Sequence, residues 1–381
     1  MRAGRKACAG IAGKSMQPVF TLSVEAKKDF VAKLLRWFVT AMRPLPWRDT
    51  YSPYSVWVSE IMLQQTQMER GVAYYKKWMR AFPDIPAVAA ADEQAILKAW
   101  EGLGYYSRAR NLHAAAKRIM AEHGGEFPRE LEAIRALPGI GEYTAGAIAS
   151  IAFNLPEAAV DANVMRVFSR ICDIDVPPDR NDVKGFIRVA VKELMPEDSP
   201  RFFSQALMEF GALVCAKKPR CAACPLAEYC EAKRLGTTAR RPKQKALRTY
   251  AVIEMATGIV LRDGLAFIQK RPPYGVWASL WEFPGGCLEA GESPESAVLR
   301  ELMEETELAV NIREKVGVFR HAYVTSRVTM HAYICDLGAD AASPVLHAAT
   351  EGRWVSPEQT AAYAFPAGHR KLLEHLGWGR G

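Results

Sequence analysis

The stretch from Leu137 to Val167 constrains this chain more than any other part of the sequence. It begins with a Gly-rich turn that contains Gly139 and Gly141, and a helical run of small and apolar residues follows. After a short loop comes Asp161, flanked by apolar residues. Glycines let the backbone turn sharply and approach another molecule closely. Free amides at the start of the following helix suit an anion such as a DNA phosphate. An ordinary corner between two helices is the alternative.

The length of 381 residues and the order of patterns predict two domains. We expect a disordered basic tail over residues 1–20, with Met16 as an alternative start, and an all-α domain over 21–232. A basic linker over 233–249 and an α+β domain over 250–381 follow. The net charge of +8 weakly favours a polyanionic partner. No apolar run approaches a membrane span.

The N-terminal part shows the apolar period of helices. Residues 24–42 form one amphipathic pattern, and a second helix starting near Pro53 is predicted to run to Met79. Within it Trp57, Glu60 and Leu63 are three apart and share a face. A carboxylic acid among apolar neighbours has a raised pKa, as a general acid near neutral pH requires. The alternative is that Glu60 is a solvated residue at a helix edge.

Four of the eight cysteines lie within sixteen positions, in the pattern C-x5-C-x2-C-x5-C. These are Cys215, Cys221, Cys224 and Cys230. Thiolates this close together can hold a tetrahedral metal ion or an iron–sulfur cluster, and the spacing does not choose between them.

From Tyr250 the pattern changes to strands. Residues 251–261 and 265–269 are joined by Asp263-Gly264, a strong hairpin signal. Strands are also expected near 316–323 and 327–336, followed by two helices. Between the strand pairs a Gly-rich loop precedes a helix on which Glu301 and Glu305 share a face. This pair could bind a divalent ion, and a soluble acidic helix is the alternative.

Taken together, the chain from about Val24 to its end resembles the MutY-type adenine DNA glycosylases. That family joins a helix-hairpin-helix glycosylase domain to a Nudix-like domain. The specific matches are Leu45-Pro46-Trp47-Arg48, Ser59-Glu60-Ile61-Met62-Leu63-Gln64-Gln65-Thr66-Gln67, Gly102-Leu103-Gly104-Tyr105-Tyr106, the Gly-rich turn, Asp161-Ala162-Asn163-Val164, the four cysteines and the Glu-rich helix.

The resemblance implies a base-excision repair enzyme that hydrolyses the N-glycosidic bond of adenine opposite 8-oxoguanine or guanine in duplex DNA. The adenine would be flipped out of the stack into a pocket. By family analogy Glu60 protonates adenine N7, and Asp161 stabilises the oxocarbenium-like sugar. Tyr143 and Asn163 match positions that support these two acids.

Other family positions imply contacts to the substrate. Gln65 and Tyr105 match side chains that wedge into the stack beside the orphan base, although core packing at a helix end is an alternative for Tyr105. The implied substrate-binding residues are Trp47, Arg48, Leu63, Gln65, Thr66, Tyr105 and Gln205.

One position separates related chemistries. Bifunctional members of the superfamily carry a nucleophilic Lys two residues after the last glycine of the turn, where this chain has Tyr143. A Schiff base needs an amine. We therefore predict a monofunctional enzyme, which also argues against an endonuclease III-like activity on oxidised pyrimidines.

By the same resemblance the four cysteines hold a structural [4Fe-4S] cluster. The first gap between cysteines is five residues here and six in the family. The loop that carries Lys217, Lys218 and Arg220 is therefore one residue shorter, which changes its expected contact with DNA phosphate.

The C-terminal domain departs from the family in two ways. Its Nudix box is complete except for the late glycine, where Glu307 stands; the matching residues are Gly286, Glu292, Arg300, Glu301, Glu304 and Glu305. The lesion-reading motif aligns with Tyr323-Val324-Thr325 or, shifted, with Phe319-Arg320-His321, and neither is a full match. A Nudix nucleotide pyrophosphohydrolase tethered to a DNA-binding helical domain is therefore the alternative function.

The expected partner is duplex DNA with A:8-oxoguanine or A:G mispairs, bound by a monomer without membrane association. The expected location is the bacterial cytoplasm, at the nucleoid. The basic first fifteen residues leave a mitochondrial presequence open.

Overall fold

A computed structural model describes residues 22–244, 250–323, 326–338 and 343–379. The predicted tail over residues 1–20 therefore lies outside the described residues. The chain divides into two compact units. Unit 1 contains residues 1–90 and 114–246, and unit 2 contains residues 91–113 and 247–381.

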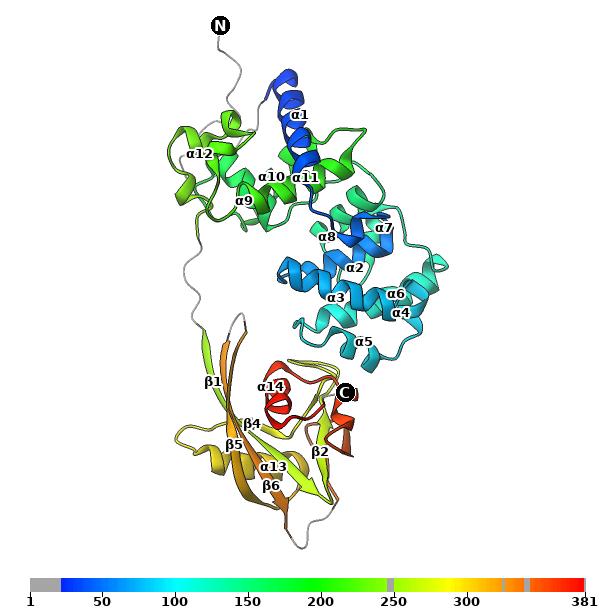
Figure 1. The fold of residues 1–381 in the computed structure, drawn as a ribbon, viewed down its shortest axis with the longest axis vertical. Helices are drawn as coiled ribbons and strands as arrows, with labels where there is room; N and C mark the ends of the chain where they lie inside the picture. Colours follow the sequence, from blue (N-terminus) through cyan, green and yellow to red (C-terminus); the bar gives the residue numbers. More distant parts are fainter. Residues whose placement is uncertain (1–21, 245–249, 324–325, 339–342, 380–381) are drawn as a thin grey trace. The chain divides into compact units, whose positions relative to one another are not determined.

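Unit 1 is all-α in the described ranges (Figure 1). Its core is formed mainly by α1, α9, α10 and α11, whose apolar faces meet around Phe30, Phe168 and Phe203. Its helices are α1 (Val24–Ala41), α2 (Pro53–Leu63), α3 (Met68–Ala81), α4 (Ile85–Ala90), α7 (Leu131–Ala136), α8 (Glu142–Ala147), α9 (Ala162–Ile171), α10 (Asn181–Leu194), α11 (Pro200–Leu213) and α12 (Glu231–Arg234), with most of α6 (Ser107–His123). The short turns are the 3₁₀ segments η1 (Pro46–Arg48), η3 (Cys221–Ala223), η4 (Ala227–Tyr229) and η5 (Thr238–Arg240) and the π-turn η2 (Ile148–Ala152).

The predicted helix from Pro53 to Met79 is in fact two helices, α2 and α3. The chain leaves the helix at Gln64, and Gln65 takes a left-handed conformation with φ 57°. Neither Gly nor Pro marks this break, so the sequence prediction missed it. The start of α2 is as predicted, since the side chain of Ser52 accepts a hydrogen bond from the amide of Ser55.

The Gly-rich turn joins α7 to α8. The amide of Ile140 donates to the carbonyl of Leu137 at 3.1 Å, and Gly139 has φ 75°, which favours glycine. Gly141 is the extended residue before α8. The sequence prediction of a helix, a tight turn and a second helix is confirmed in geometry.

The predicted linker, 233–249, is described as far as residue 244. Its first part packs on unit 1, where α12 and η5 form and Thr237 and Arg241 are buried. Arg241 forms ion pairs with Asp173 at 3.0 Å and with Asp175 at 2.9 Å. These acidic partners are distant in sequence, so the basic composition alone did not reveal this packing.

Unit 2 is built on a mixed sheet of seven strands, an α/β arrangement (Figure 1). The main order is β3-β2-β1-β6-β5, with β4 paired to β1 and β7 paired to β2. The pair β1–β6 is parallel and the other pairs are antiparallel. The strands are β1 (Ala251–Arg262), β2 (Leu265–Lys270), β3 (Trp281–Glu282), β4 (Gly285–Cys287), β5 (Val310–Ala322), β6 (Ser326–Leu337) and β7 (Glu351–Val355).

Alternating residues of β1 and β2 pack into two separate hydrophobic cores, one on each face of the sheet. Ile259 and Ile268 pack with α14 (Ala367–Leu376), whereas Val260 and Phe267 pack with α13 (Pro294–Thr306). Because successive side chains of a strand point to opposite faces, the sheet lies between these two helices. The unit also contains α5 (Glu93–Trp100) and the 3₁₀ turn η6 (Gln359–Ala362).

Most of the predicted elements of unit 2 are present. Asp263 and Gly264 both have positive φ, 52° and 77°, as a type I′ hairpin turn between β1 and β2 requires. The sequence prediction missed β7 and the very short β3 and β4, and the first of the two final helices is only a 3₁₀ turn. Strands of two or three residues carry too little alternation to be recognised.

Candidate active site

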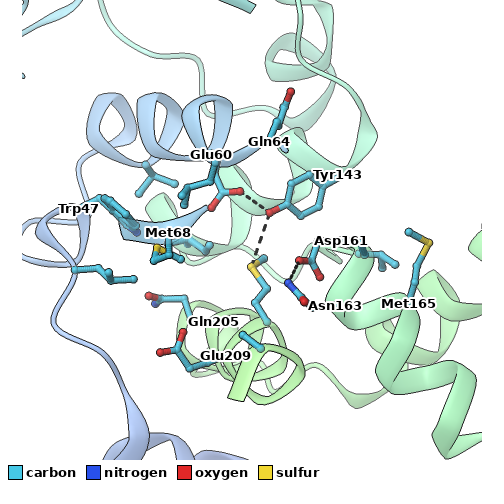
Figure 2. A pocket seen from close by; sticks show the side chains of 18 of the residues that line it. Trp47, Glu60, Gln64, Met68, Tyr143, Asp161, Asn163, Met165, Gln205 and Glu209 are labelled. Atoms are coloured by element: carbon cyan, nitrogen blue, oxygen red, sulfur yellow. Dashed lines mark hydrogen bonds between the residues drawn. The ribbon is translucent and has the colours of Figure 1, made fainter. Parts of the chain in front are cut away.

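Unit 1 contains a cavity of about 690 Å³ between η1, α2, α8, α9, α10 and α11 (Figure 2). This volume is within the range of small-molecule sites, roughly 300–1,000 Å³. The cavity brings together ten of the residues singled out by sequence, namely Trp47, Arg48, Glu60, Leu63, Gln65, Thr66, Tyr143, Asp161, Asn163 and Gln205. Gly139 and Gly141 are not among its lining residues, and Tyr105 belongs to unit 2, where it is exposed with φ 50°.

Glu60 lies on α2 and is 8% exposed. The hydroxyl of Tyr143 donates to Glu60 Oε2 at 2.5 Å and lies 3.9 Å from the sulfur of Met208 (Figure 2). Burial raises the pKa of Glu60 to about 7; the negative charge of Asp161 adds to this effect, while the Tyr143 hydrogen bond and the Arg48 charge oppose it. Glu60 can therefore carry a proton near neutral pH.

The predicted shared face of α2 is only partly correct. Val56, Glu60 and Leu63 line the cavity, but Trp57 does not. Its ring packs instead against Phe127 at a centroid distance of 5.4 Å. Because α2 is buried on nearly every side, spacing alone could not show which of its faces borders the cavity.

Asp161 is the N-cap of α9 and holds two hydrogen bonds. Its Oδ1 accepts from the amide of Val164 at 2.7 Å, and its Oδ2 accepts from the Asn163 side-chain amide at 2.6 Å (Figure 2). Burial raises the pKa of Asp161 above its usual value, whereas these donors favour the ionised form and limit the rise. The two acids thus contact different neutral donors, a hydroxyl at Glu60 and amides at Asp161.

Arg166 fixes the side chain of Asn163. One terminal nitrogen of Arg166 donates to Asn163 Oδ1 and to the carbonyl of Gly211, both at 2.7 Å, and its Nε donates to the carbonyl of Cys215 at 2.9 Å. Gly211 allows α11 to approach α9 closely, because a Cβ there would lie 2.7 Å from the Cβ of Asn163. Asp161 is therefore held through Asn163 and Arg166, and Arg166 is anchored by carbonyls of α11 and the cysteine loop.

Two residues that sequence reasoning missed, Arg43 and Glu209, also line the cavity. Arg48 donates from Nε to Gln205 Oε1 at 2.8 Å and from Nη1 to the carbonyl of Arg43 at 2.7 Å. Glu209 binds both arginines and is 2% exposed. The available signal was its position one turn after Gln205 on the same face of α11, as Figure 2 shows.

The four clustered cysteines are free and line one small cavity. Burial raises the pKa of Cys224 to about 12 and that of Cys230 to about 11, so neutral thiols are favoured without a cation. Arg170 donates to the sulfur of Cys215 at 3.3 Å. In the described part of the chain no three His, Cys, Asp or Glu side chains have a metal-holding arrangement, but the donor set of four thiols around one space fits a metal group.

In unit 2, Arg300 joins the acids of the Glu-rich segment. It contacts Glu292 at 2.9 Å and Glu301 and Glu304 at 3.0 Å each. Glu305 accepts from the side chain of Gln269 at 2.8 Å and the amide of Gly285 at 3.0 Å. Glu307 is left-handed with φ 54°, which for a non-Gly residue costs about 1 kcal/mol.

The two candidate lesion-reading alignments fall at the end of β5. The Tyr323 ring packs against His321 and Trp277, with centroid distances of 4.9 and 5.5 Å. Val324 and Thr325 lie outside the described residues, so only part of the first alignment has a described geometry.

Comparisons with known proteins match two ranges of the chain to families. Residues 58–192 match the HhH-GPD superfamily of base excision DNA repair proteins, and residues 256–375 match the NUDIX domain. A solved structure described as a thermostable thymine-DNA glycosylase is 30% identical, with a TM-score of 0.50, over 55% of this chain and 97% of that chain. The fold and the cavity thus define a DNA glycosylase of base-excision repair with a C-terminal Nudix domain.

Relatives matched over most of their own length define the family more closely. The adenine DNA glycosylase of Rattus norvegicus is 31% identical over 90% of this chain and 77% of its own length. That of Mycolicibacterium smegmatis is 37% identical over 65% of this chain and 85% of its own. The chain belongs to the adenine DNA glycosylase family. Within the described ranges, no helix combines the length and the apolar character that crossing a membrane requires.

Proposed function

We propose that this enzyme removes adenine mispaired with 8-oxoguanine or guanine in duplex DNA, without a strong strand-cleaving step. The observation that carries the proposal is the pair Glu60 and Asp161, which border one cavity with different hydrogen-bond partners. Two carboxyl groups in different protonation states suit the cleavage of a bond at an anomeric carbon.

The adenine must leave the base stack to reach these groups. Glu60 then donates its proton to N7 of the base, which makes adenine a better leaving group, and Tyr143 orients the acid through its 2.5 Å hydrogen bond. Asp161, oriented by Asn163 and the amide of Val164, stabilises the positive charge that develops on the sugar. Trp47, Leu63 and Gln205 bound the space for the base.

The position of the bifunctional enzymes' lysine supports a monofunctional reaction. Tyr143 occupies that position, its side chain is committed to Glu60, and a phenol cannot form a Schiff base. Among the described residues that line the cavity, Lys184 is the one lysine. Borohydride trapping should therefore give little or no covalent adduct, and any adduct that forms should disappear in Lys184→Met.

We further propose that Cys215, Cys221, Cys224 and Cys230 hold a [4Fe-4S] cluster. Support comes from the four free thiols around one space and from Arg170, which donates to Cys215 and to the carbonyls of Ala216 and Lys217 in the same loop. Iron and sulfide analysis of purified protein should give four of each per chain. The contents should fall in Cys224→Ser, and a zinc content of one per chain would contradict the cluster.

Other contacts complete the proposal. Gly139 and Gly141 present the first amides of α8 to a DNA phosphate. Gln65 and Tyr105, both left-handed and exposed, wedge into the stack, and Thr66 borders the base. Residues 250–381 contribute to recognition of the opposite base.

The test is single-turnover cleavage of duplexes with adenine opposite 8-oxoguanine, guanine or thymine, each worked up under neutral and alkaline conditions. Strand breaks only after alkali, fastest opposite 8-oxoguanine, are expected. Equal rates opposite 8-oxoguanine and guanine would remove the lesion-reading role of unit 2 and keep the glycosylase. No release from any duplex would overturn the proposed function.

A further inference from the structure

Glu209 is a buried acid of the cavity wall that the reaction as described does not use. It lies on α11 and is 2% exposed. Arg43 binds it through two side-chain nitrogens, at 2.7 and 3.0 Å, and through its backbone amide at 3.1 Å. Burial opposes ionisation of Glu209, but the contacts with Arg43 and Arg48 outweigh it and hold the pKa below its usual value. Glu209 is therefore a fixed negative charge at neutral pH.

Arg48 contacts Glu209 and also lines the cavity. Its side chain is 10% exposed, and its nitrogens donate to three different groups, Gln205, the Arg43 carbonyl and Glu209, the last at 3.2 Å. Its guanidinium also lies 5.6 Å from the centroid of the Phe38 ring. A guanidinium held on several sides has a fixed orientation, so its charge acts on the cavity from one place.

The Arg48 charge works against the acid that the reaction needs. A positive charge near a carboxyl group favours loss of its proton, and Arg48 acts on Glu60 in this direction. The titratable and charged groups that act on Glu60 are Tyr143 from α8, Asp161 at the start of α9 and Arg48 from η1. Farther around the cavity are Arg43, Glu142, Lys184, Arg188 and Glu209.

We propose that Glu209 is a positioning residue for the acid step: it holds Arg48 against Gln205 and offsets the Arg48 charge, so that Glu60 keeps the proton it must deliver. The same contact would present Gln205 to the base in one orientation, because Arg48 occupies the amide oxygen. This inference rests on the proposed function for its kinetic readout.

The first test is the pH profile of single-turnover adenine release by Glu209→Gln. The substitution removes the negative charge and keeps the side-chain size, so Glu60 should lose its proton more readily. The descending limb, where the rate falls as Glu60 deprotonates, should therefore move to lower pH by about one unit. The rate well above the limb should then fall roughly tenfold, since one unit is a factor of ten in proton occupancy. A uniform loss at every pH, with the limb in place, would reduce Glu209 to a structural role and overturn the proposal.

Arg43→Gln is the matched counterpart, because it should move the limb in the opposite direction. Without the Arg43 cation, the negative charge of Glu209 offsets Arg48 alone. Glu60 should then keep its proton to higher pH, and the descending limb of the pH profile should move up. Arg43 is 31% exposed at its side chain and so is the more tolerant position if Glu209→Gln does not fold. A limb that stays in place or falls in Arg43→Gln would contradict the proposal.

Two further measurements test whether Glu209 acts through Arg48 and whether the shift occurs independently of adenine release. In the Arg48→Gln background, Glu209→Gln should no longer move the limb, because its effect passes through Arg48. Difference infrared titration of the Glu60 carboxyl in DNA-free protein, with Glu60→Gln as the reference, should show the same shifts without any glycosylase activity. If adenine release fails in the wild type but these shifts appear, only the proposed function is lost; if the shifts are absent, the role of Glu209 is lost.

Discussion

The acids of the cavity and the acids on and before α13 differ in what stands next to them. In the cavity Glu60 and Asp161 accept hydrogen bonds from neutral donors, Tyr143 and Asn163, and border open space. Beside α13 one guanidinium, Arg300, bridges three carboxyl groups. Arg48, the cation that acts on Glu60, is instead held by Glu209. Acidic side chains in the two units thus differ in chemistry. Beside α13 the arginine binds the acids themselves, whereas in the cavity it binds Glu209 and leaves Glu60 and Asp161 to neutral donors.

The largest expected effect comes from removing the proton donor of the cavity. Glu60→Gln should lower single-turnover adenine release by roughly a thousandfold, because a general acid contributes on the order of 10²–10⁴. Glu157→Gln is the matched control, since Glu157 pairs with Lys192 and does not line the cavity. Retention of more than a tenth of the activity in Glu60→Gln would end its assignment as the acid.

Asp161→Asn separates charge from capping. Asn is as good an N-cap as Asp, so α9 should keep its stability and the thermal midpoint should hardly change. Adenine release should fall by about 10²–10³, as expected when one electrostatic stabiliser is lost. A large fall in the midpoint would show that the substitution disturbs α9 itself.

Tyr143→Phe should change the pH dependence more than the maximal rate. In the wild type, release should decline as pH rises through about 7, because Glu60 loses its proton there. The Tyr143 hydrogen bond lowers the pKa of Glu60, so its removal should raise that pKa and extend activity to higher pH. A limb that moves down in Tyr143→Phe would show that the hydroxyl stabilises the protonated acid.

At the end of α13 in unit 2, Glu307→Gly should change stability and leave adenine release unchanged. The position is left-handed with φ 54°, so glycine should stabilise the protein by about 1 kcal/mol. Thermal unfolding should show a small rise in the transition of unit 2, with unchanged adenine release. A decrease would mean that the contact of Glu307 with His347, at 2.7 Å, outweighs the backbone strain.

The smallest effect is expected from Glu304→Gln, which should leave adenine release unchanged. Glu304 is 59% exposed and paired with Arg300. With magnesium ions and a panel of nucleoside diphosphate derivatives, neither wild type nor variant should show turnover, because Arg300 is already bound to these carboxyls. Magnesium-dependent turnover that disappears in Glu304→Gln would show that the Arg300 contacts do not prevent metal binding, and would give unit 2 the alternative pyrophosphohydrolase activity.

Local signals predicted much of this fold. The Gly-rich turn, the Asp263-Gly264 hairpin and the apolar face of α1 depend on residues close in sequence, and each is found as expected. Strand β7 depends on its pairing with β2, so periodicity did not show it. The break at Gln65 was missed because neither glycine nor proline marks it.

The same limit applies to the site. Family motifs named ten of the cavity residues, whereas Arg43 and Glu209 were missed because their pairing joins segments 166 positions apart. The face of α2 was misjudged at Trp57, since a helix buried on nearly every side gives no polar face to read. Whether the named residues have the proposed roles stays a prediction for the experiments above.

The close contact between Gly211 and Asn163 has a consequence for genetics. Gly211 lies on α11, which lines the cavity, and its missing side chain leaves room for Asn163 to support Asp161. A mutagenesis screen scored by mutation rate should therefore recover Gly211→Ser together with substitutions of Asp161 itself. Such an allele should combine lost adenine release with reduced stability, because a Cβ at 211 would also lie 3.1 Å from backbone atoms of Asn163.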